Sequence, residues 1–321
     1  MTIDPRDRTQ CPSRGTTRFR LLPTLLIAGL VLWSAPACAQ NPAANSGGHV
    51  NPDQTVILVT GSTDGLGREV ARRLAADGAH VIVHGRNRER GEALVAEIHA
   101  TGRGSARFYA ADLGSIAEVR AFARTIIQDY DHLNVLVNNA GIWLNRSPER
   151  QLSADGHELH FAVNYLAGYA LTRLLLPLLT ESAPARIVNV ASTAQTPIDF
   201  DDPMLERGYT GGRAYAQSKL AQILFTVDLA GELEGQDVIV TALHPATLME
   251  TTMVREAGVP ARSTVDEGAD AVMQLVTAQG IESGSYYRGL EPARANAQAY
   301  DENARAALRR LSETLTGVPS R

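Results

Sequence analysis

Lys219 is the only lysine in this 321-residue chain, in which lysine and arginine together number 30, and it lies four residues after Tyr215. Two residues four apart in a helix share one face. A free tyrosine has a pKa of about 10, and a neighbouring cation lowers it by favouring the phenolate. The pair therefore indicates a tyrosine that exchanges protons, and the plain alternative is a solvated helix pair.

Two details favour the chemical interpretation of this pair. A lysine ammonium on its slim stem can reach a ribose hydroxyl, where a planar guanidinium would be bulkier. The only lysine follows one of nine tyrosines at this spacing, which is a coincidence of about 3% for a random position.

The stretch TGSTDGLG, residues 60–67, predicts a turn that binds a nucleotide between a strand and a helix. The first glycine would permit the tight turn, the second would let the backbone approach a pyrophosphate, and the third would let the helix pack closely on the strand. The start of that helix attracts phosphate through its free N–H groups. A turn that merely needs glycine is the alternative. The residues expected to contact the dinucleotide here are Gly61, Ser62, Gly65, Leu66 and Gly67.

The second expected strand, residues 79–85, ends where an NAD-binding fold places an acidic residue for the ribose 2′-OH. This chain has Gly85 there, followed by Arg86. Without a carboxylate here, a 2′-phosphate is not repelled, and a guanidinium can bind that phosphate bidentately. The pattern favours NADP(H) over NAD(H), although a surface arginine is common in this arginine-rich chain.

Apolar runs alternate with helical stretches along the chain, which predicts repeated βαβ units. We expect strands at 55–60, 79–85, 106–111, 133–141, 185–192, 237–245 and near 284–288. We expect helices at 67–78, 88–100, 115–130, 157–180, 213–233, near 266–279 and near 301–315. The fold class is therefore α/β, a doubly wound parallel sheet of the Rossmann type in a single domain, residues 54–321. Loops 193–212 and 246–265 follow strands and should carry the ligand.

The first 39 residues have the layout of a secretory signal peptide. Five arginines and two aspartates precede a 13-residue apolar run, residues 21–33, and Ala37 and Ala39 form an A-x-A site. Residues 40–53 read as a polar linker. Export to the periplasm is the favoured location, against the alternatives of an uncleaved anchor, a lipoprotein through Cys38, or a start site after the leader. Export conflicts with NADPH chemistry, because that cofactor is kept in the cytoplasm.

Charge and cysteine usage exclude several functions for the body of the chain. The leader carries +3 and the whole chain −5, so the body carries −8, which argues against a nucleic-acid or anionic-membrane partner. The only cysteines are Cys11 and Cys38 in the leader. Disulfides, cysteine metal sites and thiol nucleophiles are therefore not expected in the body, and no metal site is predicted.

Several motifs in order make this chain resemble the short-chain dehydrogenase/reductase family over about residues 54–290. They are TGSTDGLG, ADL (111–113), NNAG (138–141), an asparagine in FAVNYLAG (161–168), IVNVAS (187–192), YAQSK (215–219) and HPA (244–246). The 23-residue separation of Ser192 and Tyr215, with the AYAQSKLAQILFT stretch, is similar to the branch of retinol dehydrogenases and WW-domain oxidoreductases.

The resemblance implies four catalytic roles. Tyr215 would be the general acid/base, Lys219 would lower its pKa and bind the nicotinamide ribose, Ser192 would hold the substrate oxygen, and Asn164 would support a proton path through Lys219. Outside the glycine turn, it implies that the cofactor contacts Arg86, Asp112, Asn139, Gly141, Tyr215, Lys219, Pro245 and Thr251.

The sequence departs from the family pattern after the sixth expected strand. Ala246 replaces the usual glycine after Pro245, and Glu250 stands where a threonine usually holds the nicotinamide carboxamide. We transfer that role to Thr251, one residue later.

The leading hypothesis is an NADP(H)-dependent oxidoreductase that reduces a small, hydrophobic carbonyl compound or oxidises the matching alcohol. The alternatives are a dinucleotide-binding redox sensor or scaffold without turnover, and a sugar-nucleotide epimerase of the extended branch. Sensors usually lose the tyrosine or the lysine, and the epimerase branch favours a glycine where Asp64 stands. A homo-oligomer is possible, and nucleic acid is not an expected partner.

Overall fold

A computed structural model describes residues 50, 53–144 and 149–320. Its core is one eight-stranded sheet in the order β3-β2-β1-β4-β5-β6-β7-β8. Neighbouring strands are parallel except β7 and β8, which are antiparallel. The strands are β1 (Val56–Val59), β2 (His80–Gly85), β3 (Ser105–Ala110), β4 (Val135–Asn138), β5 (Ala185–Val190), β6 (Val238–His244), β7 (Tyr286–Arg288) and β8 (Glu291–Ala293).

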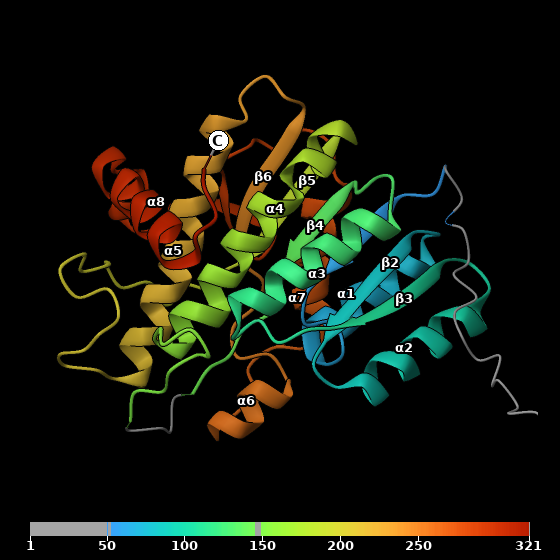
Figure 1. Ribbon diagram of the computed structural model, residues 1–321. Helices are drawn as coiled ribbons and strands as arrows, with labels where there is room; N and C mark the ends of the chain where they lie inside the picture. The colour runs from blue at the N-terminus through green and yellow to red at the C-terminus, as the bar shows by residue number, and fades with distance from the viewer. Residues whose placement is uncertain (1–49, 51–52, 145–148, 321) are drawn as a thin grey trace, which may run out of the picture. The chain divides into compact units, whose positions relative to one another are not determined.

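Helices cover both faces of the sheet (Figure 1). On one face lie α1 (Gly65–Ala76), α2 (Arg88–Thr101) and α7 (Val265–Thr277), whose apolar side chains join one core cluster. On the other face lie α3 (Ile116–Asp129), α4 (Ala167–Glu181) and α5 (Gly211–Glu232), with the C-terminal α8 (Glu302–Thr316) packed against α5. Burial of both faces explains why the central strands read as continuous apolar runs.

The chain order turns back between β1 and β4, which are adjacent at the centre of the sheet. In a doubly wound sheet this switch point opens a crevice beyond the carboxyl ends of the strands, where ligands bind. The glycine turn follows β1, and the Asn138–Gly141 stretch follows β4. The topology therefore brings the two motifs together although about 75 residues separate them.

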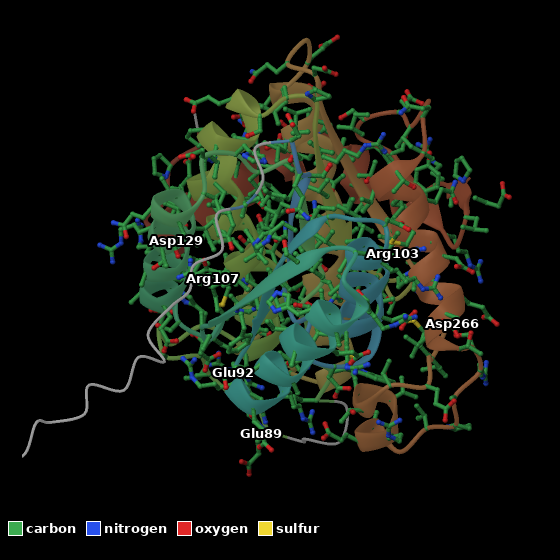
Figure 2. All side chains as sticks on the ribbon, turned by 90° about the vertical axis from the view of Figure 1, so that its right-hand side faces the viewer. Glu89, Glu92, Arg103, Arg107, Asp129 and Asp266 are labelled. Atoms are coloured by element: carbon green, nitrogen blue, oxygen red, sulfur yellow. The ribbon has the colours of Figure 1, made fainter. Side chains whose placement is uncertain are left out.

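Charged side chains mark the β3 edge of the sheet (Figure 2). Arg107 on β3 pairs with Asp129 at 3.1 Å and lies 5.0 Å from the ring centre of Tyr109. The opposite edge is the three-residue β8, which contains Pro292. Charge, proline and short length all discourage pairing of exposed edges with another sheet.

The predicted α/β class and the doubly wound sheet are confirmed, and three local details differ. The helix expected at 157–180 begins as a π-helical turn, η1 (Phe161–Leu166), before α4. The loop expected at 246–265 contains a short helix, α6 (Thr252–Ala257). The last strand, β8, was not expected, because its three residues carry no periodic signal. A 3₁₀ turn, η2 (Ala297–Tyr300), precedes α8.

Among the described residues, one helical segment, Phe161–Glu181, is long and apolar enough to span a membrane. Its most apolar window is 78% buried inside the fold, so the segment serves as a core helix. The predicted signal peptide lies outside the described residues, as does all of the predicted linker except Val50 and Asp53.

Candidate active site

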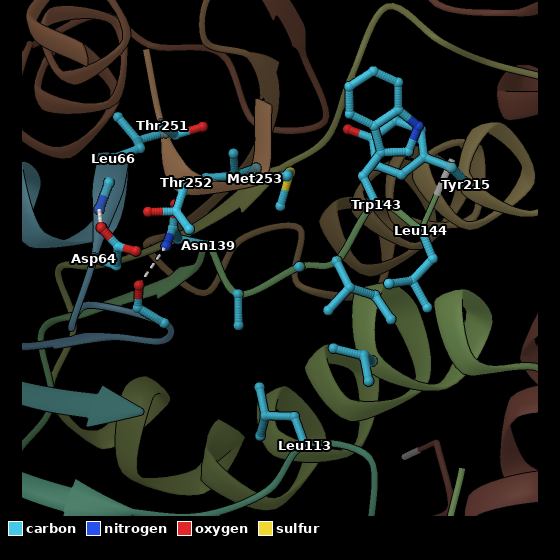
Figure 3. A pocket seen from close by; sticks show the side chains of 18 of the residues that line it. Asp64, Leu66, Leu113, Asn139, Trp143, Leu144, Tyr215, Thr251, Thr252 and Met253 are labelled. Atoms are coloured by element: carbon cyan, nitrogen blue, oxygen red, sulfur yellow. Dashed lines mark hydrogen bonds between the residues drawn. The ribbon is translucent and has the colours of Figure 1, made fainter. Parts of the chain in front are cut away.

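A cavity of about 1100 Å³ opens at the carboxyl edge of the sheet. The glycine turn and Asn139 lie at one end of it, and Trp143 and Tyr215 lie at the other (Figure 3). Single drug-sized ligands occupy pockets of roughly 300–1,000 Å³. This cavity is large enough for a dinucleotide with a small substrate beside it.

The glycines of the turn are required by conformation and by close contacts. Gly61 and Gly65 have φ of 64° and 51°, the left-handed region that favours glycine. A Cβ on Gly67 would collide with the Asn139 side chain and with the carbonyl oxygen of Gly61. The bare backbone of this turn lines the cavity at the start of α1, so it fits a dinucleotide pyrophosphate.

Neighbouring residues fasten the glycine turn in place. Asn139 donates from Nδ2 to the carbonyl oxygen of Thr60 at 2.8 Å, and Thr60 Oγ1 accepts from the backbone N–H of Asn139 at 3.0 Å. The buried Ser62 accepts at Oγ from the backbone N–H of His84 at 2.9 Å, which ties the turn to β2. Asn139 and Ser62 thus act on the shape of the turn, and Leu66 lines the cavity beside it.

Arginines surround the end of the cavity beyond β2. Arg86 is exposed and lines the cavity, and its contact with a 2′-phosphate stays a prediction. Arg90 also lines it and pairs with Asp64 at 3.2 Å. Asp64 caps α1 through Gly65 N–H at 2.7 Å, so Arg90 offsets a carboxylate at the start of α1. The donor set of this end fits an anionic cofactor.

A side chain at position 85 would require Thr63 to shift. A Cβ at this position would lie 2.6 Å from Thr63 Cγ2 and 2.7 Å from Thr63 Oγ1. The sequence alone shows a missing carboxylate; the structure adds that Thr63 occupies the space such a residue would need.

Asp112 lies two residues after β3 and lines the cavity. Its Oδ1 accepts from Gly114 N–H at 2.9 Å, and Glu118 Oε2 accepts from Asp112 N–H at 2.7 Å. These bonds hold the loop that carries Asp112, one of the residues predicted to contact the cofactor.

Tyr215 and Ser192 meet at the other end, from α5 and the end of β5. Burial raises the pKa of Tyr215, and a hydrogen bond with Ser192 acts in the opposite direction. Ser192 is buried, and its Oγ accepts from Ala194 N–H at 3.1 Å. The net direction of the Tyr215 pKa is upward, and the lowering effect of Lys219 on it stays a prediction.

Lys219 lies near the Tyr215 ring and donates hydrogen bonds to two uncharged acceptors. Its Nζ donates to Val190 O at 2.8 Å and to Gln222 Oε1 at 2.9 Å, and it is 5.8 Å from the centre of the Tyr215 ring. The residue is 4% exposed, and burial lowers its pKa to about 7. Neither acceptor carries a charge, so among the described residues no carboxylate offsets the loss of hydration of the ammonium.

Asn164 is held by the backbone rather than free in the cavity. Its Oδ1 accepts from Ile142 N–H at 2.7 Å, and its Nδ2 donates to Ile142 O at 3.1 Å and to Ser218 Oγ at 2.9 Å. It lies in the π-helical turn η1, a distortion that occurs frequently at functional sites. Gly141 is adjacent: a Cβ there would lie 3.3 Å from Asn164 Oδ1 and 3.4 Å from Lys219 Nζ.

The loop after β6 brings Pro245 and Thr251 to the cavity. Thr251 caps α6, and its Cγ2 lies 3.1 Å from the position of a Cβ on Gly65, so it covers the glycine turn. Glu250 is exposed and is not among the cavity-lining residues. Leu248 has a left-handed φ of 51°, a bend in the loop that precedes the residue at the cavity.

Sequence reasoning missed four side chains that contact the predicted site. They are Thr63, Trp143, His160 and Gln222. Two had a signal in their spacing, because Gln222 lies three residues after Lys219 and His160 four before Asn164. Trp143 and Thr63 lie in turns, where spacing does not indicate direction.

The short chain dehydrogenase family matches residues 55–260, well over half of the chain. The chain therefore belongs to the short-chain dehydrogenase/reductase family, in its retinol dehydrogenase branch, and is an NAD(P)-dependent oxidoreductase. Retinol dehydrogenase 11 of Homo sapiens is 37% identical over 278 residues, which cover 82% of this chain and 86% of the relative.

Solved structures agree with this assignment. A short chain dehydrogenase from Salmonella enterica superposes with a TM-score of 0.63 at 26% identity, covering 74% of this chain and 96% of that one. The RhlG/NADP active-site complex of Pseudomonas aeruginosa superposes with a TM-score of 0.60 at 27% identity, covering 73% and 94%.

Proposed function

We propose that the protein is an NADP(H)-dependent oxidoreductase that interconverts a small, hydrophobic carbonyl compound and the matching alcohol. The observation that carries this proposal is the meeting of Tyr215, Ser192 and Lys219 in the cavity that also contains the glycine turn. Relatives named as retinol dehydrogenases support a small alcohol or carbonyl substrate.

The bound nicotinamide would supply the hydride in the reducing direction. Ser192 Oγ would hold the substrate oxygen, and Tyr215 would deliver its hydroxyl proton to that oxygen as negative charge develops there. The products are an alcohol and an oxidised cofactor, and the phenolate then takes a proton back. Lys219 would orient the nicotinamide ribose. Asn164, which bonds the Ile142 backbone, would support a proton path through Lys219.

A panel of carbonyl compounds, assayed with NADPH and NADH, tests the proposal. We expect NADPH oxidation that depends on the added carbonyl compound. Tight NADPH binding without turnover on any member of the panel, in either direction, would instead favour a redox sensor or scaffold.

Arg86→Ala should raise the KM for NADPH roughly 10- to 100-fold, the effect of losing a hydrogen bond to a charged group. The KM for NADH should change little, because NADH lacks the 2′-phosphate. Arg88→Ala is the matched control: Arg88 pairs with Glu92 on α2, is not among the cavity-lining residues, and carries the same charge. An unchanged ratio of the two cofactors in Arg86→Ala would contradict the role.

A full switch to NADH requires more than a carboxylate at position 85. Gly85→Asp alone should damage the turn, since Thr63 occupies the space for its Cβ. Gly85→Asp combined with Thr63→Gly and Arg86→Ala is the variant that can present a 2′-OH acceptor.

We also propose export through the predicted leader, with cleavage near Ala39. Sequencing the mature N-terminus after cell fractionation should find a periplasmic protein that starts at about residue 40. A cytoplasmic body that starts near residue 50 would show that the leader is not translated or not used.

A further inference from the structure

The short segment after β4, residues 142–144, forms the cavity wall beside Tyr215, and two side chains from η1 and its entry hold it. Asn164 bonds both backbone groups of Ile142. His160 accepts at Nε2 from the backbone N–H of Leu144 at 3.0 Å. Trp143 lies between these two attachments, so its backbone is fixed on both sides.

His160 is itself locked by Glu158, and both are buried, with 0% and 2% exposure. Nε2 accepts a hydrogen bond and so carries no proton, which leaves Nδ1–H to donate to Glu158 Oε1 at 2.8 Å. Glu158 Oε2 accepts from Phe161 N–H at 2.8 Å. Both ring nitrogens of His160 therefore have a hydrogen-bond partner. Glu158 selects the tautomer whose Nε2 can accept from the Leu144 N–H.

These hydrogen bonds fix the position of Trp143. Its ring centre lies 5.8 Å from that of Tyr215, with 42° between the planes, and the ring centre of His160 lies 6.4 Å from that of Tyr215, with 83° between the planes. Trp143 lines the cavity, and the other side chains labelled near it in Figure 3 are Leu144 and Tyr215. Leu152, Val163 and Met253 add apolar lining.

We propose that His160 is a positioning residue, with its tautomer set by Glu158, that holds Trp143 as the apolar wall against which the substrate group flanking the carbonyl packs. His160 does not touch the reacting atoms and takes no proton in the reaction. The inference rests on the proposed function for its substrate, but the placement of Trp143 by His160 can be measured without turnover.

Trp143 reports on its own position, because the chain has two tryptophans and the other is Trp33 in the leader. In the full chain carrying Trp33→Phe, all tryptophan fluorescence comes from Trp143. We expect His160→Leu to increase its quenching by acrylamide several-fold. His160→Gln should restore the original quenching, since a side-chain amide oxygen can accept from Leu144 N–H.

Kinetics separate positioning from general damage. His160→Leu and Trp143→Ala should each raise the KM for a bulky apolar carbonyl compound about tenfold or more, the scale of a lost apolar contact. Neither change should alter the Kd of NADPH, and a small carbonyl compound that does not reach the wall should be affected less.

The variant Glu158→Gln/His160→Leu provides a second test in case His160→Leu alone leaves a buried carboxylate without its partner and fails to fold. Unchanged quenching and unchanged KM in a folded His160→Leu or double variant would overturn the proposal. Turnover that is absent in the unmodified protein would refute the proposed function instead, and the quenching comparison would still decide whether His160 positions Trp143.

Discussion

Replacing Tyr215 with phenylalanine should abolish turnover while NADPH binding survives. Phenylalanine keeps the ring that contacts Trp143 and His160 and removes only the hydroxyl that would donate the proton. A positioned acid or base contributes about 10² to 10⁴ in rate, so kcat should fall by at least about 10²-fold. NADPH oxidation measures the loss, and the fluorescence of bound NADPH measures the retained affinity.

Tyr209→Phe is the matched control for this change. The Tyr209 hydroxyl is buried and has no hydrogen-bond partner among the described residues, and the residue is not among those that line the cavity. Removing an unpaired buried hydroxyl does not break a bond, so stability and activity should both be kept. Wild-type kcat in Tyr215→Phe would show that the proton comes from elsewhere and would refute the mechanism.

The fold and the meeting of the distant motifs follow from patterns that the sequence displays directly. Apolar runs bounded by helical stretches give parallel strands, and their carboxyl ends must share one edge. That is sufficient to bring Gly61, Asn139 and Ser192 to one cavity. The spacing of Tyr215 and Lys219 then fixes both on one face of α5.

Other features of the site depend on contacts between segments whose sequences do not indicate that they meet. The space at Gly85 is decided by Thr63 from the glycine turn. His160 bonds a backbone N–H, which any residue except proline would supply at position 144. Helix α6 has six residues, which are too few to show a helical period of apolar residues. Burial decides the pKa of Tyr215, and burial is known only once the packing is known.

The ammonium of Lys219 can be tested by substitution and by titration. Replacing it with methionine or arginine should reduce kcat by roughly 10²-fold or more, because both remove the compact ammonium next to the general acid. Arginine keeps the charge but must fit a guanidinium where Nζ meets Val190 O and Gln222 Oε1 within 3 Å. Steady-state kinetics on folded variants checks this, and wild-type activity in Lys219→Arg would show that only charge matters.

Because Lys219 is the only lysine, protein labelled with ¹³C-lysine gives one side-chain ε-methylene signal to follow by NMR. Burial without a carboxylate partner lowers its pKa to about 7, so the signal should titrate near neutral pH in the cofactor-free protein. Gln222→Glu should move that titration upward, because a carboxylate at 2.9 Å favours the ammonium. A signal that titrates near 10.5 in the unmodified protein would contradict the effect of burial.

The same shift predicts how stability depends on pH. An unfolded lysine has a pKa of about 10.4, so between pH 7 and that value the unfolded chain binds more protons at this residue than the folded one. The free energy of unfolding therefore rises with pH across this window, and the destabilisation by the buried ammonium is fully present below pH 7. Lys219→Met removes the titrating group, so the difference in unfolding free energy between wild type and variant should slope upward from pH 7 to about 10. Urea unfolding of both proteins at several pH values measures this difference, and a flat difference would mean that Lys219 has the same pKa in the folded and unfolded chain.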